Sequence, residues 1–220
     1  MNQAATDAKH RPGLQTRKSG RLVAGTSGCT TQPVDEFGYL SVIISVILGL
    51  GIAQLLQGIS QVINARDRVR IYWPTMAWAV LLLLADTQAW WAMFGYRNRH
   101  TWTFVQFTIV LLEAIMLYLL AAIVLPNIPD KGEVDLRSNY FRHAGWFFGS
   151  LVVLLLDSLL KSLVVSGGLP GNPDLGFHLF WITTAFIAAF VRNERYHKAF
   201  VCISFGLFIA YIALLFPWLR

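Results

Sequence analysis

Three acidic residues interrupt long apolar runs of this sequence: Asp86, Glu113 and Asp157. A carboxyl group in hydrocarbon loses its hydration, so a membrane helix keeps one only where it has a partner or a function. The chemistry open to such a group is narrow: it binds a cation, relays protons or bonds a neighbouring helix. These residues are therefore the first candidates for a functional centre.

Lys161 is the basic residue of the same region and lies four residues after Asp157. An acid followed by a base at this spacing favours an ion pair within one helix. Asp86 and Glu113 have no such partner nearby in the sequence. Three alternatives are open for them: sharing Lys161, bonding glutamines of another helix as neutral acids, or serving as an ion or proton site.

Other polar and small residues follow helical faces. Gln54, Gln57 and Gln61 share one face of the first apolar run, and Gln106 shares a face with Glu113. Amide side chains at these places predict either hydrogen bonds between helices or the wall of a polar pathway. Nearly opposite the first three glutamines, a stripe of small residues predicts the close approach of another helix: Ser41, Ser45 and Gly49.

The elements that carry these residues must be membrane-spanning helices. Of the 220 residues, 55% are hydrophobic and 14% are charged, and the mean hydropathy is +0.53. This composition excludes a soluble enzyme, a disordered chain and a disulfide-rich module. A span needs about 20 apolar residues. The sequence therefore predicts an all-α polytopic membrane protein, a six-helix transmembrane bundle with spans at about 39–63, 73–95, 102–125, 144–166, 176–191 and 199–218.

The segments outside these spans are short. Residues 1–37 are polar, and we predict a disordered tail followed by a transmembrane domain over 38–220. Val34 can be encoded by GTG, an alternative bacterial start codon, so translation from Val34 is a further hypothesis. The connection 126–142 contains two prolines and is predicted to be a surface loop. Any chemistry must then lie in the bundle or at its rims.

Basic residues are unevenly distributed among the connections. The first, third and fifth hold nine Lys and Arg residues, against three in the second connection and at the C-terminal end. Cytoplasmic loops are rich in Lys and Arg, so this bias predicts a bacterial inner-membrane protein with both termini outside the cytoplasm. Five basic residues in the tail argue the other way, an objection that a start at Val34 removes. Clusters of Lys and Arg between spans indicate the orientation of the protein in the membrane rather than a nucleic-acid surface. We therefore expect the lipid bilayer as partner and no nucleic acid.

Sequence motifs of enzymes are missing. The chain has no Cys-x-x-Cys spacing, no Gly-x-Ser-x-Gly sequence and no Walker sequence, and we expect no enzyme activity, no metal and no cofactor. His143 and His197 begin predicted spans and are interpreted as solvated interfacial histidines, with axial haem ligation as the alternative. The last two spans are almost purely apolar, so we assign the polar interior to the first four.

One region resembles a group of uncharacterised bacterial six-span membrane proteins. The resemblance extends over the first four predicted spans, which is most of the chain. It implies no activity, because none is assigned to that group. The residues that carry it are Trp102-Thr103-Phe104, Leu117-Tyr118-Leu119-Leu120-Ala121-Ala122, Pro126, Asp135-Leu136-Arg137, Tyr140-Phe141-Arg142-His143 and Trp146-Phe147-Phe148.

Together these features predict a small ion or solute permease or channel, with proton coupling as one option. Glu113 and Asp86 would form its ionisable centre, and Gln54 and Gln57 would line it. The alternative is a non-transporting scaffold or sensor, in which the same polar groups join helices. Six helices are few for enclosing a pathway, so we expect a homo-oligomer.

Overall fold

The computed structural model describes residues 36–97, 99, 101–129 and 132–215, all of which belong to the compact unit Val34–Arg220. Its elements are α1 (Glu36–Asn64), β1 (Val69–Arg70), α2 (Trp73–Ala92), the 3-10 helix η1 (Met93–Tyr96), α3 (Phe104–Val124), β2 (Val134–Asp135), α4 (Leu136–Lys161), the π-helix η2 (Ser162–Ser166), α5 (Asn172–Phe190) and α6 (Glu194–Leu215). Within the described residues, six helices are long and apolar enough to cross a membrane. The predicted all-α six-helix architecture is confirmed.

The predicted tail falls almost entirely outside the described residues, as does Val34 with its hypothesis of an alternative start. Residues Glu36 and Phe37, which the sequence placed in the tail, form the first turn of α1.

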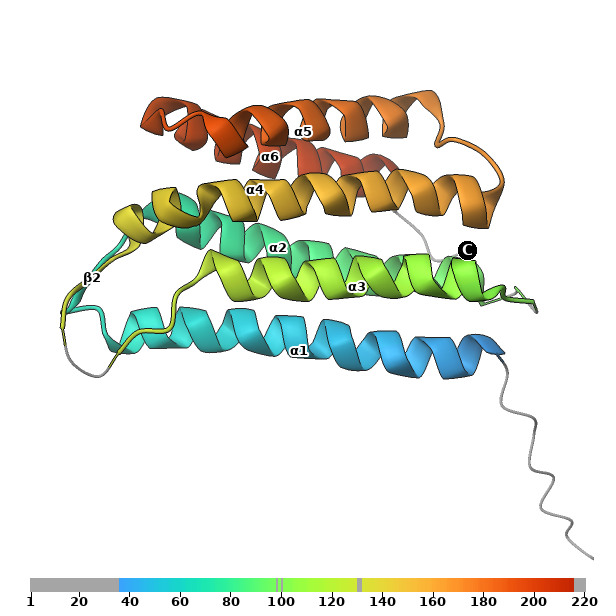
Figure 1. Ribbon diagram of the computed structural model, residues 1–220, viewed down its shortest axis with the longest axis horizontal. Helices are drawn as coiled ribbons and strands as arrows, with labels where there is room; N and C mark the ends of the chain where they lie inside the picture. Colours follow the sequence, from blue (N-terminus) through green and yellow to red (C-terminus); the bar gives the residue numbers. More distant parts are fainter. Residues whose placement is uncertain (1–35, 98, 100, 130–131, 216–220) are drawn as a thin grey trace, which may run out of the picture. The chain divides into compact units, whose positions relative to one another are not determined.

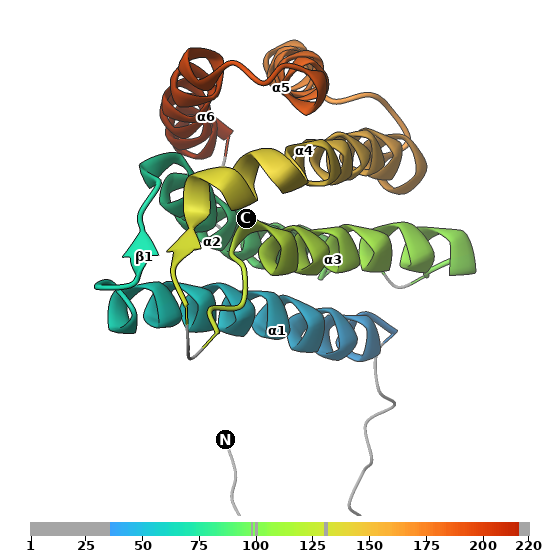
Figure 2. The ribbon, with the colours of Figure 1, turned by 60° about the vertical axis from the view of Figure 1, so that its left-hand side comes forward.

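The six helices run roughly alongside one another. α1 packs against α2 and α3, α3 packs against α4, and α4 packs against α5. Figures 1 and 2 both show α1, α3, α4 and α5 following one another across the bundle. α6 contacts α2 and α5, so that α2, α3, α4, α5 and α6 surround a common interior while α1 lies at one edge.

Two glycines give α1 a packing face different from the predicted one. Gly51 and Gly58 lie on the same face as the buried residues Leu40, Ile44, Leu48, Leu55 and Val62. A Cβ atom on Gly58 would lie 2.9 Å from Leu125 Cδ1 and 3.0 Å from Leu125 Cβ, so a larger residue would have to displace its neighbour. On the predicted stripe of Ser41, Ser45 and Gly49, an added Cβ at Gly49 would meet no atom within 4 Å. Within the chain, the leucine face is the one that α1 buries, because it offers more apolar area.

The helices α4 and α6 begin well before the residues that their hydropathy indicates. α4 begins at Leu136 rather than at 144, with the Asp135 carboxylate accepting a hydrogen bond from the Arg137 backbone N–H at 3.0 Å. α6 begins at Glu194 rather than at 199. Their first turns carry charged residues that lower the mean hydropathy, yet one side of each turn is buried. The predicted surface loop 126–142 thus contains helix.

That loop also contains a strand. β2 pairs in parallel with β1, Val69 opposite Val134 and Arg70 opposite Asp135. The pairing joins the first and third connections at one end of the bundle (Figure 2). We call this end, formed by connections 65–72, 125–129 with 132–135, and 191–193, the basic end, because nine Lys and Arg residues of the sequence belong to these connections or to the helix turns beside them.

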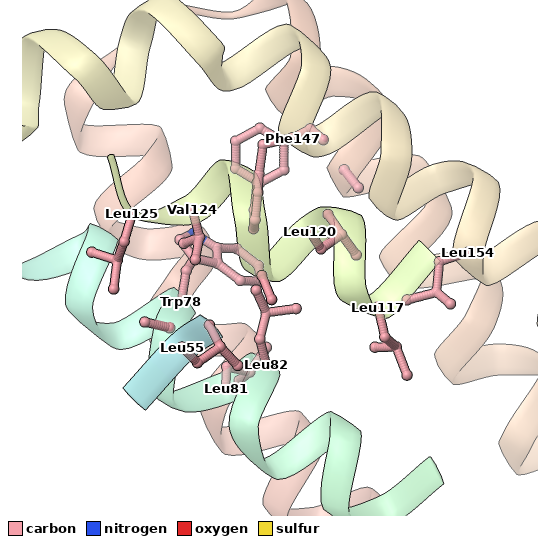
Figure 3. Close-up of a cluster of buried hydrophobic side chains, with 14 of the residues drawn as sticks. Leu55, Trp78, Leu81, Leu82, Leu117, Leu120, Val124, Leu125, Phe147 and Leu154 are labelled. Atoms are coloured by element: carbon pink, nitrogen blue, oxygen red, sulfur yellow. The ribbon is translucent and has the colours of Figure 1, made fainter. Parts of the chain in front are cut away.

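An aromatic cluster fills the bundle interior toward the basic end. Trp78 is 1% exposed and packs edge-on against Phe147, Phe148 and Phe200, with ring centroids 5.4–5.6 Å apart. Figure 3 shows Trp78 beside Phe147 and surrounded by leucines of the core. Such edge-to-face contacts stabilise an apolar core beyond the area they bury.

His197 belongs to this cluster, and its predicted exposure to solvent is wrong. It is fully buried, with Nδ1 3.0 Å from the Tyr140 hydroxyl oxygen and Nε2 2.7 Å from the Val191 carbonyl oxygen. Both ring nitrogens are therefore satisfied inside the protein, as a buried imidazole requires. Tyr72 packs against Tyr140 with ring centroids 5.4 Å apart, and burial and the charge of Glu194 raise the pKa of the Tyr72 phenol to about 12.

Candidate functional site

A cavity of about 370 Å³ lies among α2, α3, α4, α5 and α6. Cavities of this size are typical of sites for small molecules. Trp78 forms part of its wall toward the basic end, and its lining continues along α2 to Tyr96 at the opposite end. Apolar residues line the part near Trp78, among them Leu81, Leu82, Leu151, Leu154 and Leu155. Polar residues gather toward the opposite end: Tyr96, Glu113, Ser158, Lys161, Ser162, Ser166, Asp174, His178 and Tyr211.

An ion pair between two helices is the central polar feature of the cavity. Lys161 Nζ on α4 lies 2.6 Å from both carboxylate oxygens of Glu113 on α3. Their side chains are 14% and 17% exposed. The predicted pair between Asp157 and Lys161 is therefore wrong. Because α3 and α4 are packed together, the long lysine side chain reaches across their interface and binds a carboxylate on the other helix.

Asp157 and Asp86 are buried without hydrogen-bond partners in the described part of the chain. Asp157 is 4% exposed and Asp86 is 1% exposed, and no oxygen of either carboxyl group is hydrogen-bonded. The Asp86 carboxyl faces α1, because a Cβ atom built on Gly51 would lie 3.4 Å from Asp86 Oδ1. Neither residue lines the cavity. The structure thus separates Asp86 from Glu113, and the predicted common centre of these two acids does not form.

The glutamines of the predicted site do not line the cavity either, although Gln88 of α2 does. Gln57 is exposed and Gln54 is half-buried on α1, which does not border the cavity. The predicted lining by Gln54 and Gln57 is therefore wrong. Gln61 Oε1 accepts a hydrogen bond from the Ile128 N–H at 3.3 Å, and so ties α1 to the third connection.

Gln106 anchors the beginning of α3. It forms a capping box with Thr103, which satisfies two backbone N–H groups at the helix start. Its Nε2 also donates to the Val164 carbonyl oxygen of η2 at 3.2 Å. Gln106 thus joins the beginning of α3 to the segment after α4. Its partner Val164 lies three residues after Lys161 of the ion pair.

The π-helix η2 supplies the rim of the cavity. In a π-turn the backbone bonds are rearranged, and such turns are frequent at functional sites. The Arg99 guanidinium donates to the Val165 carbonyl, and Ser162 Oγ donates to the Gly168 carbonyl at 2.9 Å. Gly167 ends the segment at a φ of 78°, a conformation that glycine adopts without strain. Ser162 and Ser166 of this segment line the cavity.

A second hydrogen-bonded group in the cavity comes from residues that sequence reasoning missed. His178 on α5 is 6% exposed, and its Nδ1 lies 2.9 Å from the Asp174 carbonyl oxygen and 3.0 Å from Asp174 Oδ1. Its Nε2 lies 3.1 Å from Ser158 Oγ on α4. His178 thus joins the Asp174 carbonyl to the Ser158 hydroxyl inside the cavity, with the Asp174 carboxylate in contact with its ring.

The assignment of the polar interior to the first four spans is therefore wrong. Asp174 and His178 on α5 and Tyr211 on α6 all line the cavity. The sequence carried one signal, the four-residue spacing of Asp174 and His178, which places them one above the other on a helix. Hydropathy alone places the start of the fifth span at 176, which assigns Asp174 to the preceding loop. In the structure α5 begins at Asn172, and both residues belong to the helix.

Comparisons with protein-family models, with curated proteins and with solved structures find no match to this chain. Among the residues that the structure describes, no group of three or more His, Cys, Asp or Glu side chains is placed to hold a metal ion. The chemistry of the site therefore has to be argued from its own geometry.

Proposed function

We propose that this protein is a bacterial inner-membrane permease that binds a small amphipathic solute in the cavity among α2 to α6. The observation that carries the proposal is the Glu113–Lys161 ion pair in the wall of that cavity. The free energy lost when two charges leave water often exceeds the free energy gained from their attraction. A buried ion pair is therefore weak evidence for a role in stability. Where such a pair faces a cavity, a role in binding or charge movement explains its presence better.

The lining of the cavity suggests the class of solute. An anionic group on the solute would bind Lys161, and a cationic group would bind Glu113, each by replacing the present partner. The leucines near Trp78 would pack against an apolar body. A molecule with one charged group and an apolar part satisfies both regions. When a cationic solute displaces Lys161 from Glu113, or an anionic one displaces Glu113 from Lys161, the freed side chain would gain or lose a proton, which would couple proton movement to transport.

The distribution of basic residues supports an orientation. The polar part of the cavity lies toward the end where η1, η2 and the beginning of α5 meet, away from the basic end. By the positive-inside rule the basic end lies in the cytoplasm, and both termini lie outside. The solute would then enter from outside the cell, and the Trp78 cluster would have to open for it to leave on the cytoplasmic side.

Flux through proteoliposomes tests the proposal. The variant is Glu113→Gln together with Lys161→Gln, because the double change removes both charges and leaves neither one buried alone. The matched control neutralises the exposed Arg137–Glu194 pair, 2.8 Å long, at the basic end. We expect uptake of a radiolabelled small amphipathic ion, hexanesulfonate or hexyltrimethylammonium, in the wild type and in the control, and its loss in the cavity variant. Flux that persists in the cavity variant would show that the pair is not the transport centre.

The alternative of a scaffold or sensor predicts a different result. Folded wild-type protein would then give no more flux than protein-free vesicles, and the cavity variant would change only stability. The predicted homo-oligomer can be tested on the same samples by measuring the mass of the protein in detergent.

The row of Asp174, His178 and Ser158 favours a second candidate, a serine hydrolase that acts on an ester in the membrane. His178 Nε2 is within reach of the Ser158 hydroxyl proton, and the Asp174 carboxylate lies 3.0 Å from the other ring nitrogen, in the order of groups of a catalytic triad. In the structure that nitrogen is hydrogen-bonded to the Asp174 backbone carbonyl. Ser158 would attack the ester carbonyl, and His178 would pass its proton to the leaving alcohol. Water would then release the acid.

We place the hydrolase second because the described residues around Ser158 offer no evident oxyanion donors. Hydrolases need N–H donors for the oxyanion, and removing one such donor costs about 10²–10³ in rate. Ser158 lies inside α4, where the backbone N–H groups bond within the helix, and the nearby Lys161 is bound to Glu113. A fluorophosphonate probe decides the question. A covalent adduct on Ser158, lost in Ser158→Ala and retained in Ser162→Ala, would make the hydrolase the better proposal.

A further inference from the structure

A second hollow lies at the basic end, on the outer side of the bundle between α4 and α5. Its volume is about 420 Å³. Small residues form its floor, since a Cβ atom on Gly145 of α4 would lie only 3.7 Å from the Ala189 carbonyl oxygen of α5. The two backbones therefore approach closely at this point and leave a groove above them. We call it the α4–α5 groove.

Two arginines line the α4–α5 groove. Arg142 comes from the second turn of α4 and Arg192 from the connection after α5. Both are exposed, and within the described residues neither forms an ion pair. Glu194, only two residues after Arg192, is bound to Arg137 at 2.8 Å and Lys198 at 2.7 Å. The groove thus carries two positive charges that no acidic side chain among the described residues neutralises.

Exposed aromatic residues fix the depth of the groove in the membrane. Trp146 lines it and is 75% exposed, and Phe190, next to Ala189, is 74% exposed. Tryptophan near the end of a spanning helix lies at the level of the lipid headgroups. Farther along the same helices, Val153 and Phe186 are also exposed and continue an apolar surface toward the middle of the membrane. The arginines therefore lie at phosphate level, with an apolar surface leading from them into the acyl-chain region.

We infer that the α4–α5 groove binds the phosphate headgroup of an anionic phospholipid, with the acyl chains lying along α4 and α5. Arg142 and Arg192 bind the phosphate from both walls, and Trp146 packs beside the glycerol region. A free phosphate ion would satisfy the arginines but would leave the exposed apolar surface without a ligand. The two charges and the adjoining apolar surface together select the lipid. This site is independent of the cavity and of the transport proposed for it.

Native mass spectrometry of the full chain, delipidated and then titrated with single lipids, tests the inference. The lipids are phosphatidylglycerol and, as a zwitterionic reference, phosphatidylcholine. Each basic residue near an anionic lipid contributes about fivefold in affinity. Arg142→Gln together with Arg192→Gln should therefore weaken phosphatidylglycerol binding by about 30-fold. The matched control is Arg66→Gln, an exposed arginine at the same end whose contact with Asp67 is 3.9 Å long, and it should bind as the wild type does.

Two further measurements make the result decisive. Trp146→Ala removes the exposed ring beside the glycerol region without changing any charge, and it should weaken binding of phosphatidylglycerol while thermal unfolding in dodecylphosphocholine micelles stays unchanged. Inorganic phosphate added at millimolar concentration should not displace the lipid. Equal binding of phosphatidylglycerol by the wild type and the double arginine variant would overturn the inference. So would displacement by inorganic phosphate, which would assign the groove to a free anion. If the double variant does not fold, Trp146→Ala and the phosphate competition still decide.

Discussion

Lys161 on α4 donates hydrogen bonds to both carboxylate oxygens of Glu113 on α3, at 2.6 Å each. The bond joins two neighbouring helices in the wall of the cavity, 48 residues apart in the sequence. This ion pair also limits the choice of variants, because removing one of the two charges leaves the other one buried without a partner. Stability and function must therefore be measured on matched single and double variants.

Glu113→Gln alone should destabilise the protein by about 3–5 kcal/mol, since it leaves Lys161 without its counter-charge. The double variant Glu113→Gln, Lys161→Gln should recover most of this loss, because neutral amides can bond each other across the same interface. Unfolding in mixed detergent, followed by circular dichroism, measures both. Equal losses in the single and double variants would mean that the two side chains do not depend on each other.

Gly58→Ala should lower the free energy of unfolding by about 1–3 kcal/mol, because the new methyl group would overlap Leu125 in a filled core. Gly49→Ala is the matched control on the same helix, where the methyl group meets no atom within 4 Å. It should be neutral, or stabilising by up to about 1 kcal/mol through helix propensity. Reduced stability or altered assembly in Gly49→Ala would instead point to a helix of another chain against the stripe of Ser41, Ser45 and Gly49.

Tyr140→Phe should cost about 1–3 kcal/mol, because it leaves Nδ1 of the fully buried His197 without its partner. Tyr118→Phe provides the control, since Tyr118 is 37% exposed on the surface of α3. Thermal unfolding of the two variants side by side measures the difference. Identical Tm values would show that the hydrogen bond contributes nothing to stability.

Asp86→Leu should raise the free energy of unfolding by about 1–3 kcal/mol. Leucine branches at Cγ as aspartate does, and the change removes two buried oxygens that lack hydrogen bonds. Because Asp86 faces Gly51 and lies outside the cavity, flux in proteoliposomes should stay at the wild-type level. Loss of flux with intact folding would return Asp86 to the transport centre that the sequence suggested.

Several features could be predicted because they depend on local composition alone. A run of about 20 apolar residues must form a helix to satisfy its backbone in hydrocarbon, so the number and approximate positions of the spans follow from hydropathy. That Glu113 and Lys161 need a partner inside the bundle could also be predicted, since charges are costly in such runs. Helix ends could not, because the first turns of α4 and α6 are charged on one side and buried on the other.

By itself, the sequence determined that this protein is a six-helix membrane bundle with ionisable groups in its interior. Only the tertiary structure decided which of those groups meet. It paired Lys161 with Glu113 rather than with Asp157, turned Asp86 toward α1, and brought His178 of α5 to Ser158 of α4. The physical reason is that hydropathy depends on each residue separately, whereas a partner depends on the rotation and depth of two packed helices. Packing of the apolar faces sets those quantities, and the polar side chains take the neighbours that result.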